Sequence, residues 1–389
     1  MGTLIALKAS RVITPLMVIP NGVVLVEGER IAAVGSQDNV QIPEQAQVLD
    51  YSGHDVLPGF IDIHHHGAAG ARAGEPGATL RIAEFLPTTG VTSWVPTIFS
   101  GGIAAVMDDY RQGTRGADIL GIHIEIAYCA PKAVPGVPQL DDMLPPKPAL
   151  DDLDGWVHDA GGLLKIMGFA PELPGALELI SHCRSLGVIA SAAHTKASYE
   201  EFMRGVEAGI NHVTHVYQVM GHMHMRRPGV VGGALTCDQV TGELICDGIH
   251  NHMVPLEVMI RCKGADRIAV ITDQTDLAGM PDGTYTSHGR RRVKKGMECR
   301  EAGTTPDQDY TIAGSVATYS YGVYNLVRDL QRPLHIISRM TSLTPARIIG
   351  VGDRKGSLER GKDADMIVVD RDIDVKLAMV RGRIVHRRT

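Results

Sequence analysis

The chain has 389 residues, 44% of them hydrophobic, and its 38 basic and 44 acidic residues give a formal net charge of -6 at pH 7. This length suffices for one barrel-sized domain and a smaller companion, whereas the acidic balance offers no basic surface for nucleic acid or an anionic membrane. The hydrophobic residues lie in short runs broken by glycine and charge, and none reaches the roughly 20 residues of a membrane-spanning helix.

The N-terminus and the cysteines indicate the cellular compartment. The apolar stretch from Met1 to Leu7 is cut short by Lys8 and lacks the length and cleavage site of a secretory signal. Six cysteines are scattered without paired spacing, which favours reduced, buried thiols over disulfides or a cysteine-type zinc site. The sequence therefore predicts a cytoplasmic protein whose partner is a small molecule, with no nucleic-acid or membrane partner.

The two ends of the chain share one pattern of short β-branched runs separated by turns. Residues 4–50 contain such runs around the turn Asn21-Gly22, and residues 356–386 repeat the pattern. We expect residues 1–53 and 355–389 to form one small β-sandwich domain, and residues 54–354 to form a second domain.

In the middle of the chain, short apolar runs typical of buried strands alternate with segments of helical periodicity, which is the pattern of a parallel sheet. Eight strands are predicted, at residues 56–66, 91–98, 118–128, 163–170, 187–194, 211–217, 243–250 and 267–274. Eight such units predict an α/β fold of the (β/α)8 TIM-barrel type, whose active site lies at the C-terminal ends of the strands.

Three other segments are predicted to be surface elements. Residues 129–160, rich in proline and aspartate, read as a long loop over the barrel mouth. The basic run Arg290–Lys295 favours an exposed strand or hairpin over a polyanion site, because the whole chain is acidic. Residues 70–77 are glycine-rich without a phosphate-loop pattern and read as a flexible loop.

Histidines and acids gather where the predicted strands end. Side chains alternate along a strand, so His64 and His66 face one way, and so do His123 and Glu125. A carboxylate among the apolar neighbours of Glu125 needs a partner. Other strand ends carry the following candidates: His194, His215, Asp247, His250 and Asp273.

Such residues at six of eight strand ends indicate a shared metal ion. Imidazole and carboxylate ligands without thiolate suit zinc, iron or manganese, with zinc favoured, and leave the number of ions at one or two. The ion would lower the pKa of water and polarise a carbonyl, and Asp273 could take the proton from water and pass it to a leaving amine.

Motifs across almost the whole chain resemble the amidohydrolase superfamily, and within it the N-acetylglucosamine-6-phosphate deacetylases. They lie at residues 58–62 with His64 and His66, 121–125, 170–172, 193–195, 212–215, 226–232, 247–250, 272–273, 278–283, 313–315 and 356–365. The resemblance implies a metal-dependent hydrolase that acts on the carbon–nitrogen bond of a linear amide.

The resemblance also implies roles for individual residues. Glu125, His194 and His215 match the ligands of the main metal, and His64 and His66 match the ligands of a second ion. Some relatives lack that second pair.

Three further residues match positions that act on the substrate. Asp273 matches the general base and acid, and His250 matches a group that orients the substrate or polarises its carbonyl. Arg226 matches an arginine that reaches an anionic substrate group, in some arrangements across the interface of a homodimer or higher homo-oligomer.

The chain departs from the family around the substrate. Ile126-Ala127-Tyr128 follows Glu125 in place of the usual Gly-Pro-aromatic turn, and Val134–Pro138 replaces an element containing Gly-Ala-His. Tyr217–Met220 replaces Phe-Asn-Ala-Met, and Gln274-Thr275-Asp276 follows the base where small apolar residues are usual.

These departures bear on the choice of substrate. We predict that Tyr128, Gln218 and Asp276 line the substrate site together with Arg226 and His250. A carboxylate beside a phosphate dianion costs free energy unless a cation intervenes. We therefore expect an N-acyl amino sugar or a related polar N-acyl compound, with N-acetylglucosamine 6-phosphate itself a poor substrate.

Two other functions stay open. A cyclic amidohydrolase or deaminase would use the same water activation on a ring, and a catalytically silent metal-binding sensor or scaffold would keep only the ligands. Because a scaffold needs neither Asp273 nor His250, the enzyme is favoured.

The remaining histidines are assigned less specific roles. His54, His65 and His212 are predicted to be structural. His123 shares the face of Glu125 and either supports the ligands or fills the barrel. His222 and His224 follow the sixth strand and are left out of the metal set.

Overall fold

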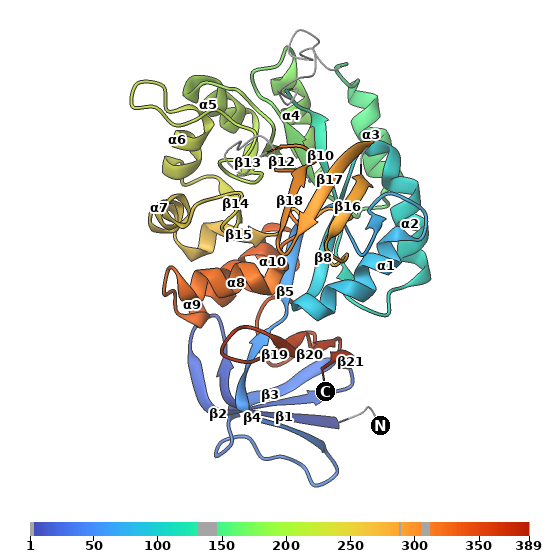
Figure 1. Ribbon diagram of the computed structural model, residues 1–389, viewed down its shortest axis with the longest axis vertical. Coiled ribbons are helices and arrows are strands. Elements are labelled where there is room, and N and C mark those ends of the chain that lie inside the picture. Colours follow the sequence, from blue (N-terminus) through green and yellow to red (C-terminus); the bar gives the residue numbers. More distant parts are fainter. Residues whose placement is uncertain (1–3, 131–145, 288, 305–311, 389) are drawn as a thin grey trace.

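The computed structural model describes residues 4–130, 146–287, 289–304 and 312–388. Strands from both chain ends lie at the bottom of Figure 1, and a larger part in which helices surround strands lies above them. The altered segment Val134–Pro138 lies outside the described residues.

The lower part is one mixed sheet that contains strands from both ends of the chain. Its strands, in spatial order, are β21 (Arg383–Arg387), β20 (Val375–Val380), β19 (Met366–Val369), β4 (Gln47–Pro58), β1 (Leu4–Ile13), β2 (Val18–Glu27) and β3 (Arg30–Ser36). β1 and β4 run parallel, whereas the other neighbours are antiparallel.

This sheet has a common core, in which Leu7 and Val24 are buried with Met366 and Leu377. The predicted small β domain from both chain ends is thereby confirmed. β4 passes residue 53 without a break, and the division into 1–53 with 355–389 and 54–354 remains a prediction.

The upper part is the predicted (β/α)8 barrel. Its parallel strands are β5 (Phe60–His65), β8 (Val91–Ile98), β10 (Ile122–Tyr128), β11 (Leu164–Phe169), β12 (Ile189–Ala192), β13 (Ile210–Val213), β14 (Thr241–Ile245) and β15 (Ile268–Ile271). The barrel closes between β15 and β5, where Asp273 N donates to His64 O at 3.0 Å and His66 N donates to Gln274 O at 2.9 Å.

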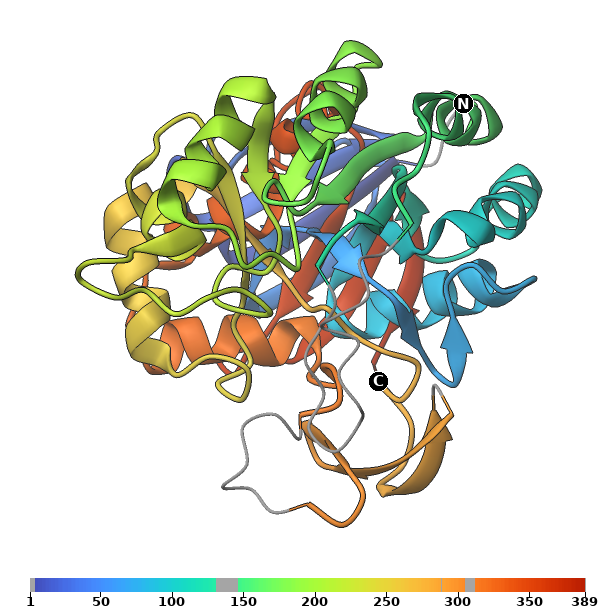
Figure 2. The same cartoon turned by 90° about the horizontal axis from the view of Figure 1, so that it is seen from above.

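Helices surround these strands in the view of Figure 2. They are α1 (Ala78–Phe85), α2 (Ile103–Gln112), α3 (Leu150–Asp159), α4 (Ala176–Ser185), α5 (Tyr199–Ala208), α6 (Gly229–Thr236), α7 (Met253–Lys263), α8 (Tyr319–Arg328), α9 (Leu334–Ser338) and α10 (Thr344–Ile348). Short helical turns add η1 (Leu86–Thr89), η2 (Ser100–Gly102), η4 (Ala265–Arg267) and the π-helical η6 (Arg339–Leu343). Among the described residues, no helix is long and apolar enough to cross a membrane.

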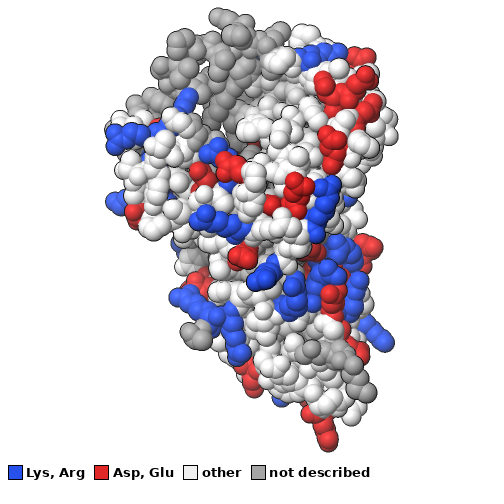
Figure 3. Space-filling view, turned by 90° about the vertical axis from the view of Figure 1, so that its right-hand side faces the viewer, with Lys and Arg blue, Asp and Glu red and all other residues white. Residues whose placement is uncertain are grey.

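Six further short strands complete the described part of the structure. They are β6 (Gly67–Ala68), β7 (Ala71–Arg72), β9 (Asp118–Ile119), β16 (Gly283–Ser287), β17 (Arg290–Lys295) and β18 (Glu298–Glu301). The basic run is therefore the middle strand of a three-stranded antiparallel sheet, as predicted. On the face in Figure 3, acidic and basic side chains are interspersed over much of the surface.

Several predicted elements differ from the structure: the predicted strand 118–128 is divided into β9 and β10, the predicted strand 243–250 ends at Ile245, and the predicted loop 70–77 contains β7. The first predicted barrel strand, 56–66, is divided at Gly59, because residues 55–58 pair with β19 and the chain then turns into the barrel. A Cβ at Gly59 would lie 2.0 Å from Thr92 Oγ1, so this turn requires glycine. The predicted loop 129–160 contains α3, which buries Leu153 against the barrel.

A buried lysine joins the two parts of the molecule. Lys355 Nζ lies 3.0 Å from Asp118 Oδ2 of β9, 3.1 Å from Asp363 Oδ2 and 2.5 Å from Asp365 Oδ2. The Lys355 side chain is fully buried. Burial alone would lower its pKa, but the carboxylates, Asp365 foremost, raise it.

Replacing Lys355 by methionine should lower the free energy of unfolding by about 3–5 kcal/mol, because it leaves the buried carboxylate of Asp365 without its cation, whereas Asp363 keeps Arg354 at 2.7 Å. Urea unfolding followed by tryptophan fluorescence measures this loss. Lys147→Met is the matched control, since Lys147 pairs with Glu178 at 3.0 Å on the surface, and its effect should stay below about 1 kcal/mol. Equal stability of the two variants would contradict the prediction.

Candidate metal centre

The five predicted metal ligands meet at the C-terminal ends of the barrel strands. Glu125 Oε1 lies 2.8 Å from His194 Nε2 and 2.9 Å from His215 Nε2. Glu125 Oε2 lies 3.4 Å from His66 Nε2, and His66 Nε2 lies 3.2 Å from His64 Nε2. Glu125 therefore lies between two pairs of histidines, with His194 and His215 on one side and His64 and His66 on the other.

These separations suit ligands of a common ion. Two ligand atoms about 2.0–2.1 Å from a tetrahedral zinc ion stand about 3.3 Å apart. The His64–His66 distance of 3.2 Å is close to that value. The potential ligand atoms of Glu125, His194 and His215 all lie within 4.8 Å of one another, and so do those of His64, His66 and Glu125.

The charges of the cluster also call for a cation. Burial alone would lower the pKa of His64, but neighbouring carboxylates, Glu243 foremost, raise it to about 9. Burial likewise opposes protonation of His66, yet hydrogen bonds to Asp273 and Glu125 raise its pKa to about 10. Burial would raise the pKa of Glu125, but His194 and His215 hold it well below its ordinary value. A metal ion can replace the protons that these histidines otherwise hold.

The backbone is strained where three of these side chains leave their strands. His194, His215 and Asp273 have positive φ angles of 42°, 28° and 53°. Such conformations cost of order 1–3 kcal/mol each and persist where the surroundings impose them. Glu172 is one support beside His194, since its two carboxylate oxygens accept from Thr195 Oγ1 and Lys196 N at 2.6 Å each.

Asp273 faces the side of the cluster formed by β5. Its Oδ1 lies 3.2 Å from His66 Nε2 and 3.5 Å from His64 Nε2. Burial would raise its pKa, but these two histidines keep the pKa below the ordinary value. Asp273 is therefore a carboxylate, and it can accept a proton beside the predicted ligands.

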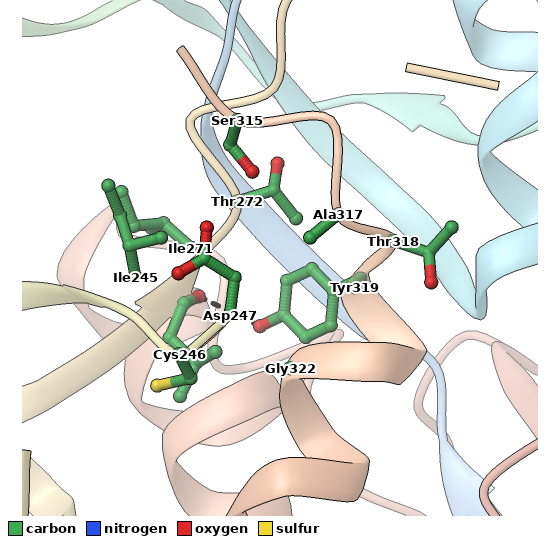
Figure 4. A pocket seen from close by; sticks show the side chains of 11 residues that line it. Ile245, Cys246, Asp247, Ile271, Thr272, Ser315, Ala317, Thr318, Tyr319 and Gly322 are labelled. Atoms are coloured by element: carbon green, nitrogen blue, oxygen red, sulfur yellow. Dashed lines mark hydrogen bonds between the residues drawn. The ribbon is translucent and has the colours of Figure 1, made fainter. Parts of the chain in front are cut away.

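His250 is held by an acid of its own loop. Its Nδ1 lies 2.6 Å from Asp247 Oδ2, and Asp247 Oδ1 accepts from the main-chain N–H groups of Ile249 and His250 at 2.8 Å each. Figure 4 shows Asp247 beside a small cavity that Thr272 and Ser315 also line, next to Tyr319 of α8. The acid thus restrains the orientation of the imidazole.

Several predicted substrate residues make contacts within the protein. Tyr128 is buried and donates to Pro174 O at 3.3 Å. Gln218 Nε2 donates to His250 O and to Asn251 Oδ1 at 3.0 Å each. Their substrate roles remain predictions.

The other two predicted substrate residues carry charge. Asp276 Oδ1 accepts from Ser287 Oγ at 2.8 Å, and its Oδ2 lies 3.8 Å from Arg72 Nη2. Arg226 lies in an exposed turn before α6. A cation thus already accompanies Asp276, whereas the guanidinium of Arg226 is accessible.

Two of the histidines predicted to be structural, His65 and His212, are fixed by polar contacts, whereas His54 packs edge-on against the ring of Tyr51. His65 Nδ1 lies 3.1 Å from Thr272 Oγ1, and His212 Nδ1 lies 2.6 Å from Thr241 Oγ1. His123, whose role was open, packs edge-on against His64 with ring centroids 4.8 Å apart. Burial lowers the pKa of His123 to about 3, so its ring is neutral.

One acid of the centre was missed by the sequence analysis. Glu243 lies in β14, fully buried, and its Oε2 is 2.8 Å from His64 Nδ1. The available signal in the sequence was an acidic residue within an apolar run typical of a buried strand, because a buried charge needs hydrogen-bonding or charged partners.

Comparisons with known proteins agree with this geometry. The model of the amidohydrolase family matches residues 56–385. The chain is 33% identical to N-acetylglucosamine-6-phosphate deacetylase from Bacillus subtilis, over 97% of this chain and 96% of that protein. It is 30% identical to N-acetylgalactosamine-6-phosphate deacetylase from Escherichia coli O157:H7, over 88% of this chain and 90% of that protein.

A solved structure is similar over the full length. N-acetyl-D-glucosamine-6-phosphate deacetylase from Mycobacterium smegmatis, in complex with N-acetyl-D-glucosamine-6-phosphate, has a TM-score of 0.87 and 26% identity, and the match covers 99% of this chain and 100% of that chain.

Proposed function

Because the chain belongs to the amidohydrolase family, we propose that it removes the acetyl group from a phosphorylated N-acetyl amino sugar at the centre around Glu125. It is a metal-dependent amidohydrolase of the deacetylase type. The observation that carries the proposal is the convergence of Glu125, His194, His215 and the carboxylate of Asp273 at one end of the barrel.

The reaction needs water, a base and an acid at one place. A bound divalent ion lowers the pKa of water and polarises a carbonyl. Asp273 takes the proton of the attacking water as the new carbon–oxygen bond forms, and gives it to the nitrogen as the carbon–nitrogen bond breaks. The products are acetate and the free amino sugar. His250, restrained by Asp247, orients the substrate or its carbonyl.

The donor set supports zinc first, with iron or manganese also compatible, because it combines imidazole and carboxylate without thiolate. Glu125, His194 and His215 would hold the main ion, and His64 with His66 a second ion beside Glu125. Two ions per chain are therefore part of the proposal.

The expectation that the phosphorylated sugar is a poor substrate loses one of its three supports, which were the replaced Gly-Ala-His element, the altered turn after Glu125, and Asp276. The third support placed the Asp276 carboxylate beside the phosphate without a cation, but Asp276 bonds to Ser287 and lies beside Arg72. The relatives from Bacillus subtilis and Escherichia coli are both named for 6-phosphate sugars. The phosphorylated substrate is accordingly the one we propose.

The assay that tests this function measures acetate, formate and ammonia released from phosphorylated and unphosphorylated N-acetyl and N-formyl amino sugars. The proposal requires acetate without ammonia, and a kcat/KM at least tenfold higher for the phosphorylated N-acetyl sugars. Opening of a cyclic amide, or ammonia release from an amino-substituted ring, without acetate would favour the cyclic amidohydrolase or the deaminase respectively. A protein that binds metal but forms none of these products would be the sensor or scaffold.

Arg226 supplies the charge that would favour a phosphate. Replacing it by alanine should lower kcat/KM for the 6-phosphate sugar about 10- to 100-fold, as expected for one lost charge-assisted contact of about 1.5–3 kcal/mol, and leave the unphosphorylated sugar nearly unchanged. Arg111→Ala is the control, because Arg111 pairs with Asp108 on α2. Equal losses on both sugars would contradict this role.

Assembly and location extend the proposal. We propose a homodimer or higher homo-oligomer, in which Arg226 from its exposed turn can reach a neighbouring site. A cytoplasmic location is supported by the six cysteines, all of which are free thiols. Mass measurement in solution tests the assembly, and a monomeric enzyme with full phosphate preference would contradict it.

A further inference from the structure

The buried carboxylate of Glu243 in β14 contacts His64 of β5 and two groups in and just after β13. Glu243 Oε2 lies 2.8 Å from His64 Nδ1 and accepts from His215 N at 3.0 Å. Glu243 Oε1 lies 3.1 Å from His212 Nε2. Both its oxygens are therefore used, and the Glu243 side chain has no exposed surface.

These contacts determine which nitrogen of His64 carries the proton. A carboxylate only accepts hydrogen bonds, so His64 Nδ1 must be the donor to Glu243. The lone pair of a neutral imidazole then lies on Nε2. His64 Nε2 is the atom that stands 3.2 Å from His66 Nε2 and 3.6 Å from Glu125 Oε1, so Glu243 presents it in the form that binds a metal.

The same carboxylate also holds the other half of the centre. His215 has a positive φ of 28°, and the bond from its main-chain N–H to Glu243 stabilises this strained turn. Glu243 therefore links the ring of His64, on the side of the second ion, to the backbone of His215, on the side of the main ion.

The surroundings explain how a carboxylate is tolerated at this depth. An unpaired buried charge costs several kcal/mol, which hydrogen-bond donors must offset. Three hydrogen-bond donors surround the Glu243 carboxylate. One of them, His212, is also held through its other ring nitrogen, Nδ1, which lies 2.6 Å from Thr241 Oγ1. A residue that served packing alone would need none of these groups.

We propose that Glu243 is a positioning residue that orients His64 as a ligand of the second ion and couples its placement to that of His215. This inference rests on the proposed function, because it concerns the metal centre of that reaction. Outer partners of metal-bound histidines generally change metal affinity about 10- to 100-fold when they are replaced.

Co²⁺ titration of the metal-free protein tests the proposal, with calorimetry for affinity and anomalous diffraction for the position of each ion. Glu243→Gln and Glu243→Asp are the two variants. Gln removes an acceptor without changing the shape of the side chain, and Asp keeps the charge but is too short to contact His64 and His215 together. Each should bind the ion at His64 and His66 about 10- to 100-fold more weakly.

Ser191→Ala is the matched control for a purely structural effect. Ser191 is buried in the neighbouring strand β12 and bonds to Thr214 Oγ1 at 2.6 Å. It should lower the thermal midpoint without changing Co²⁺ affinity, whereas the Glu243 variants change both.

Three results would overturn the proposal: unchanged affinity in both Glu243 variants, a loss in Glu243→Gln alone, or an equal loss in Ser191→Ala. Crystal structures of the metal-free variants give a readout that needs no ion, since the His64 ring should turn away in Glu243→Asp. An unchanged ring would also overturn the proposal. Wild-type protein that binds no Co²⁺ would instead contradict the proposed function, and the ring orientation would then decide the role of Glu243.

Discussion

Replacing Asp273 by asparagine should lower kcat by at least about 100-fold, the usual contribution of an acid–base group. An amide has nearly the same shape as the carboxylate but cannot take a proton from water and return it to the leaving nitrogen. Because the amide keeps the size of the carboxylate and can still contact His66, which lies 3.2 Å from Asp273 Oδ1, the loss should fall on turnover, with folding and metal content near normal.

Asp266→Asn is the control for this experiment. Asp266 lies on the surface at η4 and bonds to Arg339, so its variant should keep the activity of the wild type. Steady-state kinetics with the 6-phosphate sugar and metal analysis of both variants make the comparison. Full activity of Asp273→Asn would remove this residue from the mechanism.

Removing the metal should lower the activity at least as much as the Asp273→Asn substitution does. Chelation should lower activity by at least about 100-fold, because a bound ion contributes several kcal/mol to the reaction, and zinc, iron or manganese should restore it. His194→Ala should lose the main ion and the activity together, since His194 Nε2 stands 2.8 Å from Glu125 Oε1.

His182→Ala is the matched control, because His182 pairs with Asp154 on the outside of the barrel at 2.8 Å. Its metal content and activity should equal those of the wild type. Activity that is indifferent to chelators and to His194→Ala would exclude a metal-dependent reaction.

The barrel could be predicted from the sequence because its strands are short apolar runs that end in distinctive residues. The order of the strands follows the order along the chain, so strand ends that are far apart in the sequence meet at one rim. This is why residues as distant as His64 and Asp273 could be assigned to one site before their separation was known.

Element boundaries could not be predicted in the same way. Residues 56–66 were predicted to form one strand, but Val56 pairs with Val368 of β19, and Phe60 pairs with Val91 of the barrel. The break at Gly59 depends on these partners, which no local pattern contains. The helix α3 was hidden among prolines and aspartates for the same reason, since the burial of Leu153 depends on the barrel beneath it.

The direction in which a side chain points was the least predictable feature. The sequence indicates that Asp276 and Tyr128 depart from the family, but their partners are Ser287, Arg72 and Pro174. These partners lie in β16, in β7 and in the segment before α4, and they determine how much of each side chain remains free to contact a substrate.

Glu243 is a residue of the metal centre that belongs to none of the sequence motifs. Its role comes from strand pairing, because β14 lies beside β13 and its side chain reaches His64 across the barrel. An acid in a buried-type strand was visible in the sequence, but its three donors could be identified only from the fold.

Anomalous diffraction from crystals of the purified protein, recorded on both sides of the zinc absorption edge, tests whether the cluster around Glu125 binds metal. One peak is expected about 2.0–2.2 Å from the ligand atoms of Glu125, His194 and His215, and a second peak within reach of His64 and His66. Crystals grown in zinc-containing solution that show no peak at either position, with the imidazoles hydrogen-bonded to the carboxylates alone, would contradict this expectation.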